Sequence, residues 1–230
     1  ETFALYDELG SWDKFRLLTW SKPFNYAAIN NFAAAEAGGK YLLFLNNDVS
    51  MIAPDWLDEL IGQCQWKENA AVGAKLYYGD GSIQHAGVII GLGGIAGHIA
   101  RLFKHDAYGY FGSLQLVRNL TAVTGACLLV KRNKFAQIGG FDEEFALAFN
   151  DVDLCLRLIN KGGLIVWTPH AEAYHYESKT RGLDNTTEKR ERLEREERLF
   201  ASRYQGLLEA GDPNYSPNLN LTRPDFSVKL

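Results

Sequence analysis

The sequence has little of several features that mark particular classes of protein. Its three cysteines in 230 residues are odd in number, widely spaced and each beside apolar residues, so they indicate buried thiols of a reducing compartment, not a disulfide framework or a zinc site. There is no basic excess, and a net charge of −4 argues against a general nucleic-acid-binding protein. No apolar run approaches the roughly 18 residues of a membrane span, and no targeting segment is visible. We therefore expect a cytoplasmic protein with no nucleic-acid partner.

What is present is an ordinary globular composition, 47% hydrophobic and 23% charged. The length allows roughly 70% of the unfolded surface to be buried, in one large domain or a domain with a tail. Strand patterns alternate with helical patterns, which predicts an α/β sheet with helices on its faces. Strands are expected at 15–20, 41–45, 71–76, 121–130 and 164–167, an extended piece at 171–176, and helices at 3–9, 25–37, 54–66, 133–138, 150 to about 161, and 186–204.

Two segments have apolar patterns that make a more specific prediction. Residues 41–45 are apolar at every position, which predicts a strand buried on both faces, as in a parallel sheet. The charge-dense stretch 186–204 has only a thin apolar face at Leu193, Phe200 and Tyr204, which predicts a solvated surface helix. The residues after it are rich in turn formers, so we expect an irregular tail.

The stretch 141–157 has aromatic residues and carboxylates that run into an amphipathic helix. Asn150 is a favourable N-cap residue, and Asp151 and Asp153 then lie near the positive end of the helix dipole. Asp153 and Arg157 are spaced to pair at i, i+4 on the exposed side. A carboxylate at the tip of a rigid helix, beside an aromatic loop, is a candidate general base at the edge of a cleft. The alternative is an ordinary acidic first turn of a helix.

A second polar cluster follows the strand expected at 41–45. Asp48 comes just past the carboxyl end of that strand, where ligands bind in open α/β sheets, and Asn46-x-Asp48 offers two oxygen ligands on one side of an extended backbone. Oxygen ligands suit Mg²⁺ or Mn²⁺, and an imidazole from His175 would favour Mn²⁺. Such a cation would neutralise a diphosphate. Taken singly, an Asn-Asn-Asp turn or a lone histidine is more often structural.

Five motifs occur in order along the chain. They are Leu45-Asn46-Asn47-Asp48-Val49, Thr124-Gly125-Ala126-Cys127, Gly139-Gly140-Phe141-Asp142-Glu143, Asn150-Asp151-Val152-Asp153-Leu154 and His175-Tyr176-Glu177-Ser178. Together they resemble glycosyltransferase family 2, whose members have the GT-A fold, over nearly the whole chain from about Pro23 to beyond His175. Three shorter phrases are similar to the bacterial branch that builds O-antigen and other surface polysaccharides, including rhamnosyl-transferring members; they are Pro23-Phe24-Asn25, Gln84-His85-Ala86-Gly87 and Asp212-Pro213.

The resemblance implies an α/β GT-A architecture, with a mixed, Rossmann-like sheet flanked by helices. Residues 1–183 would form the catalytic domain, and residues 184–230 a charged helix and irregular tail packed on it. Family members begin with strands that hold the nucleotide base, and this sequence begins after them, so we expect an N-terminally truncated domain. The family's frequent Glu-Asp pair is replaced by Asn150-Asp151, which keeps the base but not the preceding carboxylate.

The resemblance also implies an enzyme that transfers a sugar, with inversion, from a UDP- or dTDP-linked donor to a glycan or lipid-linked acceptor, assisted by Mn²⁺ or Mg²⁺. Asp48 would bind the metal and the donor diphosphate, His175 would complete the metal site, and Asp151 would deprotonate the acceptor hydroxyl. Further candidates are Asn31, Asn46, Gly125, Ala126 and Arg181 on the donor side, and Asp142, Glu143 and Asn150 on the acceptor side. Lys179 and Arg181 could close over the diphosphate as a lid. Other parts of a full-length protein could provide peripheral membrane association.

Two interpretations from other classes compete with this one. Residues 88–90 followed by Gly91-x-Gly93-x-x-Ala96 have the form of a dinucleotide-binding turn, which would indicate an NAD-dependent oxidoreductase. That strand is very short, however, and the next acid, Asp106, is closer than the ~20 residues expected for a ribose-binding carboxylate. The other alternative is a catalytically silent sugar- or nucleotide-binding fragment that keeps the fold. In a transferase, His85 and His98 would shape the sugar or acceptor site, or only turn the chain.

Overall fold

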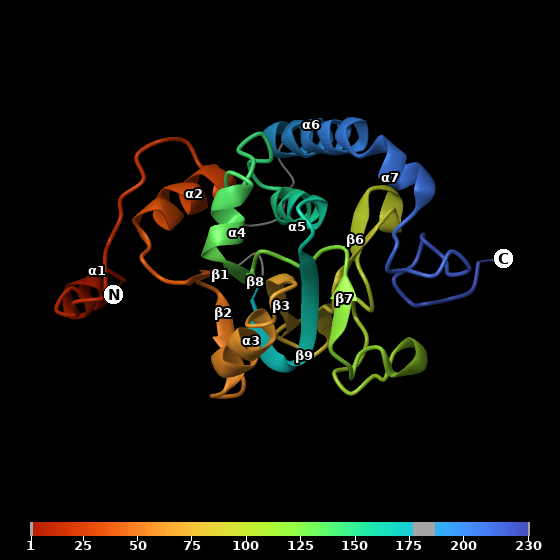
Figure 1. The fold of residues 1–230 in the computed structure, drawn as a ribbon, viewed down its shortest axis with the longest axis horizontal. Helices are drawn as coiled ribbons and strands as arrows, with labels where there is room; N and C mark the ends of the chain where they lie inside the picture. Colours follow the sequence, from red (N-terminus) through yellow and green to blue (C-terminus); the bar gives the residue numbers. More distant parts are fainter. Residues whose placement is uncertain (1, 177–186, 230) are drawn as a thin grey trace.

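A computed structural model describes residues 2–176 and 187–229 of the chain. Its strands are β1 (Tyr41–Leu45), β2 (Val49–Met51), β3 (Asn69–Tyr77), β4 (Ile83–His85), β5 (Val88–Ile90), β6 (Ala96–His98), β7 (Arg118–Leu120), β8 (Cys127–Lys131) and β9 (Leu164–His175). The central sheet is mixed and has the order β1-β8-β3-β9-β2, with β4 added to β3 and β7 added to β9 (Figure 1). The strands β5 and β6 form a separate two-stranded ribbon.

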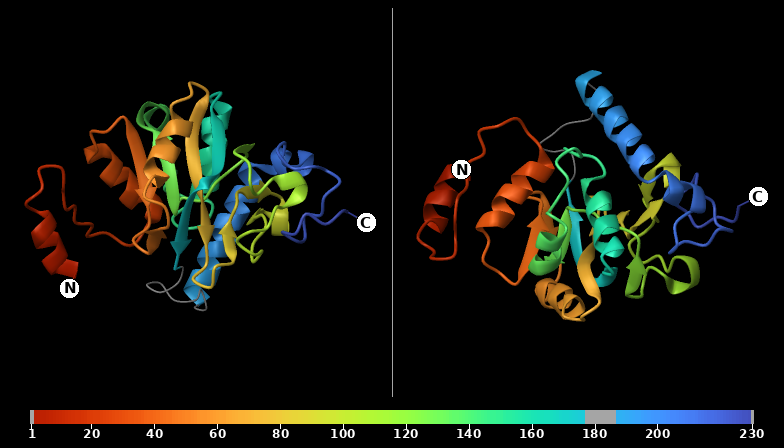
Figure 2. Two further views of the ribbon diagram at one scale, coloured as in Figure 1. Left: turned by 90° about the horizontal axis from the view of Figure 1, so that it is seen from below. Right: turned by 45° about the horizontal axis from the view of Figure 1, so that its top comes forward.

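The helices cover both faces of the sheet. They are α1 (Thr2–Leu9), α2 (Tyr26–Glu36), α3 (Trp56–Cys64), α4 (Arg132–Gln137), α5 (Asn150–Asn160), α6 (Thr187–Arg203) and α7 (Gln205–Ala210), with single 3-10 turns at η1 (Leu92–Gly94) and η2 (Tyr110–Gly112). The larger apolar core cluster includes residues of α2, α4 and α5, whereas α3 packs on the other face in a smaller cluster. Figure 2 shows α6 crossing over the side of the molecule that carries α5. None of the described helices is long and apolar enough to cross a membrane.

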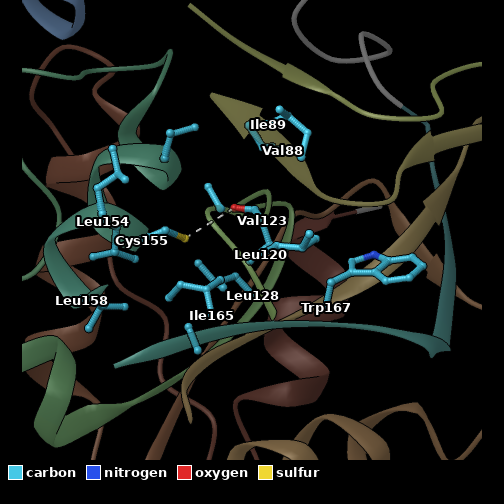
Figure 3. Packing of buried hydrophobic residues seen from close by; sticks show 14 of the residues in the cluster. Val88, Ile89, Leu120, Val123, Leu128, Leu154, Cys155, Leu158, Ile165 and Trp167 are labelled. Atoms are coloured by element: carbon cyan, nitrogen blue, oxygen red, sulfur yellow. Dashed lines mark hydrogen bonds between the residues drawn. The ribbon is translucent and has the colours of Figure 1, made fainter. Parts of the chain in front are cut away.

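The core is centred on β3 and α5. Every residue of β3 is buried, because this strand lies between β8, which is antiparallel to it, and β9, which is parallel. The apolar side of α5 faces the sheet as its spacing predicts, and the fully buried Cys155 points to Val123, with 3.9 Å from its Sγ to the Val123 carbonyl oxygen (Figure 3). Burial raises the pKa of the Cys155 thiol to about 12. All three cysteines are buried free thiols, as expected.

The expectation that residues 41–45 are buried on both faces in a parallel setting is wrong. Within the described residues β1 pairs with β8 alone, in antiparallel register from Tyr41↔Lys131 to Leu45↔Cys127. Its burial alternates, since the side chains of Leu42 and Phe44 are buried and that of Leu45 is 44% exposed. One face of β1 is buried, where Phe44 contacts Phe135 and Phe141, and the other face is covered only in part, where Tyr41 and Leu43 pack against the smaller cluster.

Three other expected strands differ in their limits. Residues 15–20 form no strand, and the apolar side chains there pack singly, as Trp20 does against Phe32. The strand expected at 121–130 is present only in its second half, as β8, because residues 121–126 lie outside the named strands and Thr124, Gly125 and Ala126 line a cleft instead. The pieces at 164–167 and 171–176 are joined in β9, where a register shift opposite 73–75 absorbs the break at Pro169. The expected helices are present, each within a few residues of its predicted limits.

Most of helix α6 is solvated, as its charge suggested, but one side of it packs on the loop before α5. Phe200 is fully buried against Phe145 and Phe149, and Glu196 is 1% exposed. The Oε2 atom of Glu196 accepts hydrogen bonds from the backbone N–H groups of Ala148 at 2.6 Å and Leu147 at 3.3 Å. Charged residues on this helix therefore bind the loop that precedes α5. The proposed division between residues 183 and 184 falls outside the described residues and stays a prediction.

Candidate active site

A cleft of about 1020 Å³ opens where β1, β8 and β9 meet the start of α5. It is lined by most of the residues that the motifs singled out, which are Asn46, Asp48, Gly125, Ala126, Asn150, Asp151 and His175. They come from four separate segments of the chain. The spatial clustering that a shared site requires is therefore present, whereas the chemical role of each residue stays a prediction.

Sheet pairing brings Asp48 and His175 together. The backbone N–H of Asn46 bonds to the Ala126 carbonyl at 2.9 Å, which extends the pairing of β1 with β8 by one residue. The chain then turns into β2, whose first residue, Val49, is paired with His175 in antiparallel register. The Tyr176 N–H donates to the Asp48 carbonyl at 2.9 Å. The positions of Asp48 and His175 are thus fixed by backbone hydrogen bonds on both sides.

The side chains of Asp48 and His175 lie close enough together to bind one divalent cation between them. The Nε2 atom of His175 lies 3.2 Å from Asp48 Oδ1 and 3.3 Å from Asn46 Nδ2. Despite that proximity, Asp48 Oδ1 is buried and accepts no hydrogen bond from the described residues. A buried carboxylate oxygen is costly to leave unpaired, and a cation bound to both side chains would satisfy it. No group of three or more His, Cys, Asp or Glu with metal-binding geometry occurs among the described residues, so substrate or water oxygens would supply the remaining ligands.

The other candidate, Asp151, is anchored to the segment just before β8. Its Oδ2 atom accepts a hydrogen bond from the Gly125 N–H at 2.8 Å, and its Oδ1 atom accepts one from the Val152 N–H at 2.9 Å. The Tyr26 hydroxyl donates to the Gly125 carbonyl at 3.0 Å. A Cβ atom at Gly125 would lie 3.1 Å from the Tyr26 hydroxyl, so a glycine allows this close approach. Burial, and then the nearby Asp151, raises the pKa of Tyr26, so its hydroxyl remains a donor.

Two expectations for the start of α5 are corrected. Asn150 is not the N-cap, because the helix already begins there and the preceding Phe149 has a left-handed φ of 59°. The Asn150 amide instead donates to the Leu147 carbonyl at 2.7 Å. Asp153 pairs with Arg157 at 2.7 Å as expected, but its side chain is 0% exposed instead of facing solvent. The reason is α6, whose C-terminal end covers Asp153.

Three candidates lie away from the residues that line the cleft. The Asn31 amide bonds to both backbone groups of Phe141, and its Nδ2 atom also donates to Glu143 Oε1 at 3.1 Å. Asp142 pairs with Arg203 at 2.6 Å. These contacts hold the 141–145 loop in place, so the donor-side role of Asn31 and the acceptor-side roles of Asp142 and Glu143 stay predictions without a geometric counterpart. Arg181 and Lys179 lie outside the described residues.

The cleft also contains two arginines and a tyrosine that the sequence interpretation did not assign, and one of the two histidines that it expected near the sugar or acceptor site. Arg101 and Arg192 add positive charge to its lining. Arg101 is held by Tyr78, whose hydroxyl oxygen accepts a hydrogen bond from Arg101 Nε at 2.6 Å. His98 lines the cleft, whereas His85 is fully buried behind it, 3.2 Å away between the two Nδ1 atoms. Burial first, and then His98 and His175, hold the pKa of His85 well below its usual range.

Gln84 is a further residue of the site that was missed. It is 4% exposed and lines the cleft, and its Oε1 atom lies 2.7 Å from His175 Nδ1. The only signal in the sequence was its place in the Gln84-His85-Ala86-Gly87 phrase, which suggested a branch of the family and no role.

The glycine-rich turn at 91–96 does not have the geometry of a dinucleotide site. It joins β5 to β6, which are paired in antiparallel register from Val88↔His98 to Ile90↔Ala96. A dinucleotide-binding turn must lead from a strand into an α-helix whose N-terminus receives the pyrophosphate. The turn here leads into a second strand through η1, so the oxidoreductase interpretation has no structural basis.

Comparisons with known proteins agree with this architecture. No family model matches the chain. A protein of Sinorhizobium fredii described as uncharacterized is 49% identical over 218 residues, covering 94% of this chain and 24% of that protein. The O-antigen biosynthesis protein RfbC of Myxococcus xanthus is 43% identical over 232 aligned positions, covering 100% of this chain and 18% of RfbC. The N-acetylglucosaminyl-diphospho-decaprenol L-rhamnosyltransferase of Mycobacterium tuberculosis is 45% identical over 62 residues, covering 27% and 20%. The chain spans about a quarter or less of the length of these relatives.

Two solved glycosyltransferases have the same fold at low sequence identity. GalNAc-T7, solved with UDP, GalNAc and Mn²⁺, superimposes with a TM-score of 0.60 at 12% identity over 76% of this chain and 34% of that one. The mannosyltransferase PcManGT from Pyrobaculum calidifontis, solved with GDP-Man and Mn²⁺, gives a TM-score of 0.55 at 14% identity over 85% and 50%. The chain therefore has the GT-A fold of glycosyltransferases, as expected.

The narrower resemblance is also confirmed. Relatives named for O-antigen biosynthesis and for rhamnosyl transfer match this chain, so it is similar in sequence to the bacterial, rhamnosyltransferase-like branch of glycosyltransferase family 2.

Proposed function

We propose that this chain is the catalytic part of an inverting glycosyltransferase of bacterial surface-polysaccharide synthesis. It would move a sugar from a UDP- or dTDP-linked donor to a glycan or lipid-linked acceptor. The observation that carries the proposal is one cleft lined by both the Asp48–His175 pair and the anchored carboxylate of Asp151. The proposal includes a cytoplasmic location, with any membrane association supplied by other parts of a longer protein.

The donor half of the proposed site is formed by Asp48 and His175, with Asn46 beside them. These residues would hold Mn²⁺ or Mg²⁺, which when bound would stabilise the negative charge that develops on the leaving nucleoside diphosphate. The unpaired Asp48 Oδ1 atom supports this assignment. The backbone at Gly125 and Ala126 would face the donor, and the arginines Arg101 and Arg192 add positive charge to the same cleft.

The acceptor half centres on Asp151. An acceptor hydroxyl is a weak nucleophile, and a positioned carboxylate that takes its proton as the new bond forms can supply ~10²–10⁴ in rate. The two N–H groups that bind Asp151 fix the direction of its oxygens, so little reorganisation is needed at the moment of transfer. Attack by the acceptor oxygen on the face opposite the leaving diphosphate, in one displacement, inverts the anomeric carbon.

The test compares sugar transfer and donor binding in two variants. Asp151→Asn should lower turnover by about 10²–10⁴ and leave calorimetric binding of UDP or dTDP in Mn²⁺ nearly unchanged, because it removes only the proton acceptor. Asp48→Ala should abolish the metal-dependent part of that binding. Asp58→Asn is the matched control, since Asp58 is an exposed residue in the first turn of α3, as Asp151 is in the first turn of α5.

Full turnover of Asp151→Asn would remove Asp151 as the base. Metal-dependent diphosphate binding without turnover of the unmodified chain would favour the silent binding fragment. The short share of the relatives that this chain covers is the observation behind that second candidate.

A further inference from the structure

Gln84 makes two contacts with one residue of the proposed metal site. Its Oε1 atom lies 2.7 Å from His175 Nδ1, and its Nε2 atom donates to the backbone carbonyl oxygen of His175 at 3.4 Å. Gln84 itself is 4% exposed on β4, which pairs with β3 in the central sheet. A buried side chain bound at both ends of its amide has little freedom to rotate.

These two contacts fix where the hydrogen of the His175 ring lies. A backbone carbonyl oxygen can only accept, so the amide group that faces it is the NH₂ of Gln84. The amide oxygen then faces His175 Nδ1, and because that oxygen can only accept, Nδ1 carries the hydrogen. In the neutral imidazole the lone pair is therefore on Nε2.

The surroundings of Nε2 agree with this tautomer. Asn46 Nδ2, a donor, lies 3.3 Å from Nε2, and Asp48 Oδ1, which lies 3.2 Å from Nε2, accepts no hydrogen bond from the described residues. The contact between Nε2 and Asp48 Oδ1 is therefore a close approach without the alignment of a hydrogen bond. A nitrogen lone pair and a carboxylate oxygen at this distance repel each other unless a cation binds both.

We propose that Gln84 is a positioning residue that holds His175 in the Nδ1–H tautomer and so presents Nε2, together with Asp48 Oδ1, to a divalent cation. The inference rests on the proposed function because that cation would serve the donor diphosphate. Partners that orient a metal-binding histidine in this way typically account for roughly 10- to 100-fold in metal affinity. Gln84 does not touch the cation or the substrate in this account.

The first measurement is independent of both metal and activity. Histidine labelled with ¹⁵N is observed by long-range ¹H–¹⁵N correlation at a pH where the imidazoles are neutral, and His175→Gln identifies the His175 signals among the five histidines of the chain. The unmodified protein should show the hydrogen on Nδ1 of His175. Gln84→Leu should lose this preference, Gln84→Glu should keep it because a carboxylate oxygen still accepts, and Gln65→Leu, at an exposed glutamine, is the control.

The second measurement is the calorimetric Kd for Mn²⁺ alone and with UDP. Gln84→Leu should weaken Mn²⁺ binding by roughly 10- to 100-fold, whereas Gln84→Glu and Gln65→Leu should stay near the unmodified protein. An Nε2–H tautomer in the unmodified protein, or an unchanged Mn²⁺ Kd in Gln84→Leu, would overturn the inference. A correct tautomer without any Mn²⁺ binding by the unmodified protein would instead refute the metal-assisted function and, with it, the role of Gln84 toward a cation. If Gln84→Leu does not fold, the Gln84→Glu comparison and the tautomer of the unmodified protein still decide.

Discussion

Arg203, the last residue of α6, binds three carboxylates, and its removal tests how the loop before α5 is held. Its Nη1 atom lies 2.6 Å from Asp142 and 3.1 Å from Asp153, and its Nη2 atom lies 2.9 Å from Glu144. Its guanidinium also lies over the Phe145 ring at 4.9 Å. We expect Arg203→Ala to lower the free energy of unfolding by about 2–4 kcal/mol.

The magnitude follows from how exposed each partner is. The Asp153 side chain is 0% exposed, and a hydrogen bond to such a charged group is worth about 1.5–3 kcal/mol. Asp153 keeps its bonds to Arg157 and to the Tyr204 hydroxyl, so the larger penalty of a wholly unpaired buried charge does not apply. The Glu144 side chain is 67% exposed, so its bridge adds little. The ring contact with Phe145 adds about 0.5–1 kcal/mol.

The assay is urea unfolding, with Arg198→Ala as the matched control on the same helix. Arg198 pairs with Glu194 at 3.7 Å, and the two side chains are 72% and 63% exposed, so its loss should cost about 0–1 kcal/mol. If Arg203→Ala cost no more than Arg198→Ala at an unchanged m-value, the contact with buried Asp153 would not stabilise the fold and the reasoning would be refuted.

Two further predictions follow from the same region and from the cleft. Burial acts to raise the pKa of Asp142, but the Glu144 N–H and Arg203 outweigh it, so the pKa is lowered. The ionised carboxylate therefore stabilises the fold above the ordinary pKa of 3.8, and this stabilisation is lost as the pH falls below that value. The difference in unfolding free energy between the unmodified protein and Asp142→Asn, measured in urea, should shrink in acid, and a difference that grew there would contradict this sign. Gly125→Ala should displace the Tyr26 hydroxyl, lower the free energy of unfolding by about 0.5–1.5 kcal/mol and reduce sugar transfer. Gly38→Ala is the control, because its Cβ would meet nothing within 4 Å, and it should change neither stability nor transfer. Equal effects of the two substitutions would show that the close approach at Gly125 is unimportant.

Local patterns in the sequence were sufficient to predict most helices and strands, but not to predict which of them lie next to one another in the fold. The apolar spacing of α5 correctly predicted which of its sides faces the core, because that spacing is a property of one helix. The pairing of β1 could not be read in the same way. An all-apolar run of five residues suits a central strand and equally an end strand whose exposed side is partly covered, and only the register with β8 distinguishes them.

The site shows the same limit. Asp48 and His175 were paired by resemblance, and the physical link is β2, a three-residue strand too short to stand out in the sequence. The burial of Asp153 depends on Arg203 and Tyr204, about fifty residues later, and Gln84 contacts His175 across 91 positions. Polar contacts of this range have no periodic signature, so they become visible only when the chain is folded.

The way α6 binds the loop has a consequence for recombining this domain with its relatives. Glu196 holds the backbone at 147–148 while Arg203 holds Asp142, so the two ends of the loop that leads to Asp151 are matched to charges 48 and 61 residues later in the chain. A chimera that exchanges the loop without the helix, or the helix without the loop, would separate partners that are both at least partly buried. Crossover points that keep 141–203 as one block leave this match intact, and that block is therefore the natural unit to exchange between this chain and its relatives.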